Sequence, residues 1–170
     1  MSDLYQKVGD MQGMLEKLVN KIPGFGGYIE KEKRREADRL LRDTIANRYG
    51  EQLGRLSRVQ NQLIGSGGIE YLDDVQDAIL RLQRFIDMTK TAPMGYSGFF
   101  DAVKVKEAEL AKLYAFDNAL LENAGKVSEA VGALEAAVGT DGLSGAIRQL
   151  VTLVAECNTT LERRKEVLTS

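Results

Sequence analysis

The sequence predicts an all-α protein, an elongated up-and-down antiparallel bundle of four long helices with a shorter helix at the N-terminus. Three observations support this fold class. Apolar residues recur at intervals of three and four over most of the 170 residues, which is the spacing of one helix face. There are only 2 prolines and no tryptophan. Stretches rich in glycine separate the apolar runs, as turns between helices do. We expect a single helical-bundle domain over residues 1–170.

The first expected element is a leading helix over residues 1–22. Six apolar residues share one of its faces: Leu4, Val8, Met11, Leu15, Leu18 and Ile22. The helix ends at Pro23, because proline disfavours the helical conformation in the residue that precedes it. Three arrangements of this helix remain open: it packs on the bundle, it exchanges between subunits, or it stays free of both.

Residues 23–91 are expected to form a first helical hairpin. Its first helix runs from about residue 29 to residue 63, with its apolar residues on one face. Gly50 lies inside this helix and weakens it by about 1 kcal/mol relative to alanine, so the helix can kink there. The sequence Gly-Ser-Gly-Gly at residues 65–68 indicates a turn. A second helix begins near Leu72 and stops before Pro93.

Residues 92–170 are expected to form a second hairpin. Its first helix runs from about residue 105 to residue 138, and its apolar residues alternate at three and four over four heptads, as in a coiled coil. A Gly-Thr-Asp-Gly turn at residues 139–142 precedes a last helix from residue 143 to about residue 168. Both hairpins follow a stretch that opens with proline and contains glycine and aromatic residues. Few other side chains match, so a duplication is only one explanation of this similarity.

Composition excludes several classes of function. The 23 basic and 25 acidic residues give a net charge of −2, which argues against nucleic-acid binding. The absence of histidine removes the commonest general base and metal ligand, together with Ser-His-Asp and Cys-His sites. A single cysteine makes neither an internal disulfide nor a thiolate zinc site. We therefore expect no enzyme activity, no metal and no cofactor.

The expected location is cytoplasmic. The N-terminal sequence has no apolar core of a signal peptide. No apolar run approaches the roughly 18 residues that a membrane-spanning helix needs.

The glycine- and aromatic-rich stretches are the first candidate site. If each helix reverses the direction of the one before it, both stretches lie at the same end of the bundle as the C-terminus. They hold five of the aromatic residues: Phe25, Tyr28, Tyr96, Phe99 and Phe100. Four basic residues follow the first stretch: Lys31, Lys33, Arg34 and Arg35. This end carries a small excess of basic residues, whereas the opposite end carries an excess of acidic ones.

Two interpretations of this aromatic end remain open. The rings and cations form a docking surface for a protein partner or for anionic lipid headgroups. Alternatively, the rings fold back and plug the end of the bundle, and the glycines permit the tight turns that this requires. The charges of residues 30–43 alternate in sign at intervals of three and four, which favours a solvated helix face over a nucleic-acid site.

A second candidate is a strip of small residues on the helix expected over residues 105–138. Gly125, Gly132 and Gly139 recur every seven residues beside several alanines. Each glycine costs roughly 0.5–1 kcal/mol of helix stability, so a compensating close approach of another backbone is expected. That backbone belongs either to a neighbouring helix of the same chain or to a second subunit. Gly139 also fits a helix C-cap.

Two further residues lie at apolar positions. Asp117 falls among leucines, and because a buried unpaired carboxylate is costly, we expect it either to pair with a basic residue or to lie where the seam opens to water. Arg81 and Arg84 are the candidate partners. Cys157 has the spacing of a core residue and is expected to be a buried, inert thiol.

Together these observations predict a non-enzymatic helical interaction or scaffold protein. It self-associates, or docks a protein partner, through helix faces and the aromatic end. The alternative is a peripheral membrane protein that binds anionic lipid through the same end.

Overall fold

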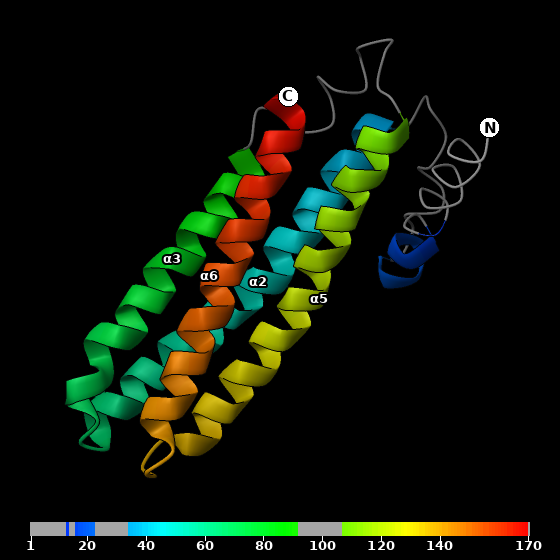
Figure 1. Cartoon of the computed structure of the whole chain (residues 1–170). Coiled ribbons are helices and arrows are strands. Elements are labelled where there is room, and N and C mark those ends of the chain that lie inside the picture. Colours follow the sequence, from blue (N-terminus) through cyan, green and yellow to red (C-terminus); the bar gives the residue numbers. More distant parts are fainter. Residues whose placement is uncertain (1–12, 14–15, 23–33, 92–106, 170) are drawn as a thin grey trace.

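The protein is an all-α helical bundle (Figure 1). The computed structural model describes residue 13 and residues 16–22, 34–91 and 107–169. Four long helices account for most of these residues: α2 (Arg34–Gly65), α3 (Leu72–Thr91), α5 (Glu107–Ala137) and α6 (Leu143–Thr169). A short 3-10 helix, η3 (Ile69–Tyr71), precedes α3. The predicted fold class is confirmed. α2 is one continuous helix through Gly50.

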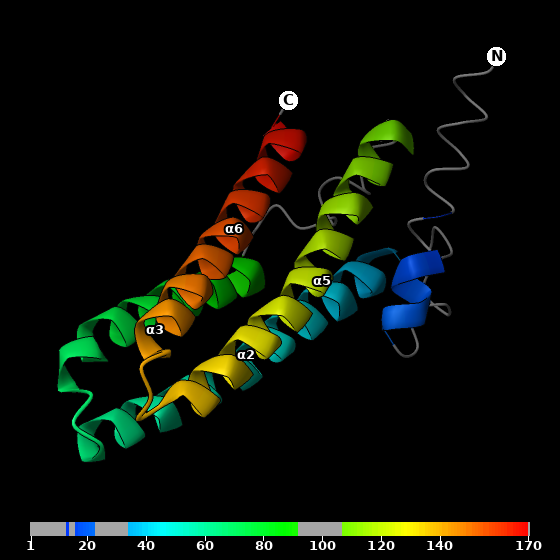
Figure 2. The same ribbon diagram turned by 60° about the horizontal axis from the view of Figure 1, so that its bottom comes forward.

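The four helices form two antiparallel hairpins that stack as two layers (Figures 1 and 2). α2 packs on α3 in one layer, and α5 packs on α6 in the other. Between the layers, α2 packs on α5 and α3 packs on α6. Both hairpins start at the same end of the bundle, so the helices paired across the layers run parallel (Figure 1). Residues 92–106 therefore join two helices, α3 and α5, that stand at diagonal corners.

The two glycine-rich turns lie together at the other end of the bundle (Figure 1). After α2, Gly67 has a φ of 82° and the Gly68 amide donates to the Leu63 carbonyl at 3.0 Å, which is a Schellman motif. A Cβ at Gly68 would lie 2.7 Å from Leu63 Cδ2, so the buried Leu63 side chain would have to shift to admit a larger residue there. After α5, Gly139 has a φ of 78° and fits the C-cap role.

A short leading segment, residues 16–22, packs on the side of the bundle at α2 and α5 (Figure 1). Residues 16–21 are helical, and the Ile22 amide donates to the Leu18 carbonyl at 2.9 Å. Leu18 and Ile22 are both fully buried. Of the three arrangements open for the leading helix, its described part adopts packing on the bundle.

The core lies between the two layers and consists mostly of leucine, isoleucine, valine and alanine from all four helices. These are the positions that the three-and-four spacing assigns to the inner faces. Nowhere in the described ranges does a helix offer an apolar stretch of the length that a bilayer crossing needs.

Candidate interaction surfaces

The predicted aromatic end falls outside the described part of the chain. Seven of its members are not described: Phe25, Tyr28, Tyr96, Phe99, Phe100, Lys31 and Lys33. Arg34 and Arg35 form the start of α2. The helix ends that adjoin both stretches do lie at one end of the bundle, beside the end of α6 (Figure 1). Docking of a protein, docking of lipid and plugging of the bundle all stay predictions.

Tyr49 lies at the centre of the bundle and links α2 to the other three helices. Its hydroxyl donates to the Leu120 carbonyl of α5 at 2.5 Å and lies 3.3 Å from Cys157 Sγ of α6. Its ring meets Phe85 of α3 edge-on, with 4.6 Å between ring centroids. Because the hydroxyl proton goes to Leu120, the Cys157 thiol is the donor to the Tyr49 oxygen.

Both polar groups of this contact are neutral at ordinary pH. Burial raises the pKa of the Cys157 thiol to about 11 and raises the pKa of Tyr49 well above its usual value. Cys157 is fully buried and has no exposed thiolate to act as a nucleophile. The predicted buried position of this thiol is confirmed.

Asp117 of α5 has a basic partner, but not the one expected. Arg164 of α6 donates from Nε to Asp117 Oδ1 at 2.9 Å, and both side chains are almost completely buried. Arg81 instead binds Asp77 on its own helix at 3.0 Å. The prediction that Arg81 or Arg84 pairs with Asp117 is therefore wrong, and the reason is the arrangement of the helices in the bundle. α3 stands diagonally across the bundle from α5, whereas α6 is the neighbour of α5 in the same layer.

Gly132, in the middle of the predicted glycine strip, lies at the seam between α2 and α5. The described residues place no atom within 4 Å of a Cβ built at Gly125 or Gly139. At Gly132 the nearest atom is Arg55 Nη2 of α2, at 3.4 Å. Only Gly132 therefore has a neighbour, the side chain of Arg55. No backbone of the described residues approaches any of the three glycines. Close packing against a second subunit stays a prediction.

Arg55 crosses this seam and joins α2 to α5. Its Nε donates to Glu135 Oε1 at 2.8 Å, and Nη2 also contacts that oxygen. Nη1 donates to Ser128 Oγ at 3.0 Å and to Gln52 Oε1 at 2.8 Å. The Arg55 guanidinium passes beside Gly132, where a Cβ would lie 3.4 Å from Nη2, in ordinary van der Waals contact.

Nearer the start of α5, the same seam holds the leading segment. Lys21 Nζ donates to Asn118 Oδ1 and to Glu122 Oε1, both at 3.2 Å. Arg48 Nη2 of α2 donates to the Lys21 carbonyl at 2.6 Å. Leu18 and Ile22 supply the apolar part of the contact. Own-chain residues therefore cover this seam along a large part of its length.

The spacing of residues along α2 alone predicts no role for Arg48 or Arg55. Both lie on the same side of α2, seven residues apart, and Gly125 and Gly132 have the same spacing on α5. Because α2 and α5 run parallel, equal spacings stay in register along the seam. The equal spacing of the two arginines and the two glycines is visible in the sequence. It predicts a contact only once α2 and α5 are known to be neighbours.

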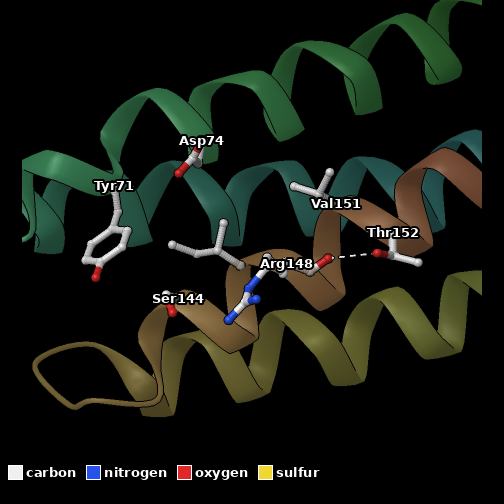
Figure 3. Close-up of a pocket in the computed structure, with 7 residues that line it drawn as sticks. Tyr71, Asp74, Ser144, Arg148, Val151 and Thr152 are labelled. Carbon is white, nitrogen blue, oxygen red and sulfur yellow. Dashed lines mark hydrogen bonds between the residues drawn. The ribbon is translucent and has the colours of Figure 1, made fainter.

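The opposite seam, between α3 and α6, carries a surface groove of about 560 Å³ (Figure 3). Tyr71 and Asp74 line one wall, while the other residues come from α6: Ser144, Ile147, Arg148, Val151 and Thr152. In the close-up, the side chains of Asp74 and Arg148 do not reach each other across the groove (Figure 3). Farther along the same seam, Arg81, Arg84, Met88, Asn158 and Glu162 line a second hollow of about 410 Å³. No described residue of the chain covers this seam.

Within the described ranges, no group of three or more histidine, cysteine, aspartate or glutamate side chains is placed to hold a metal ion. Comparison of the chain with protein-family models, curated proteins and solved structures gives no significant match.

Proposed function

We propose that the chain is a non-enzymatic interaction protein that binds other polypeptides through the outer faces of its helical bundle. The buried polar groups of its interior support this, because Tyr49, Cys157, Asp117 and Arg164 bind groups on neighbouring helices and hold the bundle together. The hollows described above lie on the outside, where the two hairpins meet.

The observation that carries the proposal is the difference between the two seams. At the α2/α5 seam, an amphipathic segment of the chain itself is bound. At the α3/α6 seam, the half-buried Tyr71 and Val151 lie beside charged groups and no described residue covers them. A groove with apolar walls and a polar rim is typical of a surface that takes a helix from a partner. The aromatic end is a second surface for the same function.

The test is affinity capture from the native host with variants of the α3/α6 groove. Arg148→Glu reverses an exposed charge of the groove, and Thr152→Arg places a long side chain at its rim. Arg58→Glu on α2 makes the same charge change away from this groove and is the matched control. We expect partners recovered with the parent chain and with Arg58→Glu to fall at least several-fold with both groove variants. Equal recovery with all four chains, at equal melting temperature, would reject this groove as the binding surface.

A further inference from the structure

The contact between the leading segment and the bundle has the features of a specific docking site. Leu18 and Ile22 lie four residues apart, so they share one face of the helix, and both are fully buried. Between them, Lys21 donates to Asn118 and Glu122 of α5. The site thus recognises two apolar side chains and one cation in a fixed order along a helix.

Arg48 adds recognition of the helix end. The last carbonyls of a helix have no partner within it, and a cation close to them also interacts favourably with the helix dipole. Arg48 Nη2 donates to one such carbonyl, that of Lys21, at 2.6 Å. In a helix that continued, the amide four residues later would use that carbonyl. The site therefore fits the C-terminal end of a helix rather than the middle of one.

The covalent connection to α2 does not force the segment onto its own bundle. Arg48 lies 14 residues beyond the start of α2, which corresponds to about 21 Å along the helix. Eleven residues, 23–33, connect Ile22 to Arg34, and a chain of that length spans up to roughly 40 Å. The tether is thus about twice as long as the distance along the bundle requires, so its length is sufficient for docking without holding the segment tightly at its own seam.

We infer that the α2/α5 seam is a docking site for a helix C-terminus, and that the leading segment of a second copy of this chain occupies it by exchange. Exchange of an identical segment recreates every contact of the single chain, so it forms a dimer at little cost. The Lys21–Glu122 pair is largely solvent-exposed on the Glu122 side, which makes release of the segment easy. This inference rests on the proposed function, because it specifies self-association as one form of it.

The protein concentration decides whether the leading segment docks on its own copy or on a second one. A segment joined to its site by a short connection has an effective concentration in the millimolar range there. The chain's own segment therefore dominates in dilute solution. Exchanged dimers accumulate as the protein concentration approaches that range.

A zero-length carbodiimide cross-linker tests the exchange on the full chain. The reagent joins a lysine amine to a carboxylate as an amide and takes up the water that is lost. Lys21 Nζ and Glu122 Oε1, 3.2 Å apart, are suitable partners. Equal amounts of ¹⁵N-labelled and unlabelled full-length protein are mixed at increasing concentration, cross-linked and digested. Mass spectrometry then shows whether the Lys21 and Glu122 peptides carry the same label or different labels.

We expect same-label pairs alone in dilute solution and mixed-label pairs that approach half of the total at high concentration. Same-label pairs at every concentration would overturn the inference. Absence of the cross-link would overturn it as well, because the contact itself would be missing. Lys21→Arg keeps the charge and removes the amine, so it identifies the cross-linked position.

Leu18→Asp together with Ile22→Asp is the control for random collision. These changes remove the apolar contact and leave the four helices unaltered, so the mixed-label pairs should disappear. Their persistence in this variant would overturn the inference. The result is independent of the α3/α6 groove, so failure of the exchange and failure of groove binding are separate outcomes.

Discussion

Asp117 shows how one side chain in the interior depends on a partner from another helix. Its carboxylate lies among leucines, where an ionised group is stable only with a charged or hydrogen-bonding neighbour. Arg164 meets it at 2.9 Å, and the side chains are only 2% and 5% exposed. The pair fixes α5 against α6 by geometry. A buried ion pair of this kind contributes more to the choice of arrangement than to net stability.

Asp117→Ala is expected to lower the free energy of unfolding by about 3–5 kcal/mol, because Arg164 stays buried without this carboxylate. The double change Asp117→Leu with Arg164→Met removes both charges and should cost less than the single change. Urea denaturation followed by circular dichroism measures both values. Asp77→Ala, which breaks a half-exposed pair with Arg81, is the control and should cost less than about 1 kcal/mol. A similar loss in Asp117→Ala and Asp77→Ala would contradict this role of the pair.

At the scale of one element, α5 combines a stable core face with two glycines that weaken it, Gly125 and Gly132, and a third, Gly139, follows its end. Gly139 ends the helix with a φ of 78°, a conformation that costs little only for glycine. A Cβ at Gly132 would meet Arg55 Nη2 at 3.4 Å, in ordinary van der Waals contact, whereas Gly125 has open space around it. The three glycines, which look equivalent in the sequence, therefore have different surroundings. Only Gly139 has a backbone conformation that favours glycine.

Alanine at Gly125 and at Gly132 should affect stability differently. Gly125→Ala meets no neighbour, so we expect a gain of about 0.5–1 kcal/mol, or roughly 1–4 °C in melting temperature. Gly132→Ala gains the same helix propensity but places its Cβ 3.4 Å from Arg55 Nη2, so a smaller gain is expected. Thermal unfolding by circular dichroism measures both. Light scattering on the same samples tests the strip as a subunit contact, since Gly125→Ala would then lower the mass. A loss of stability in Gly125→Ala without a change of mass would contradict the open environment.

Helix positions and inner faces were predictable from the sequence, because burial imposes a period of three and four on each helix separately. The start of α3 at Leu72, the start of α6 at Leu143 and the buried Cys157 all follow from that period. The partner of Asp117 did not follow, because the spacing shows which face is buried and not which helix lies against it. Arg48 and Arg55 were missed for the same reason. Their roles exist only once α2 and α5 are neighbours.

On the scale of the whole molecule, the two hairpins are joined by contacts at several positions along the length of the bundle. Tyr49 contacts the other three helices at the centre, and Arg55 links α2 to α5 nearer the glycine-rich turns. Neither hairpin buries its inner face without the other, because the core lies between the layers. The leading segment differs, since it adds only Leu18, Ile22 and a few polar contacts at the edge.

This arrangement predicts one cooperative unit of four helices and a leading segment that opens alone. Hydrogen exchange measured by mass spectrometry should show equal, highest protection at the centre of all four helices and much lower protection in residues 16–22. Tyr49→Phe removes the hydroxyl that donates to Leu120 and accepts from Cys157, at an expected cost of about 1–2 kcal/mol. Because the four helices unfold together, that loss should lower protection equally in both hairpins and leave the leading segment unchanged. The control Tyr71→Phe removes the hydroxyl of a half-buried tyrosine that lines the surface groove and should leave protection as it is. Reduced protection confined to α2 and α3 in Tyr49→Phe would show instead that the two layers unfold as separate units.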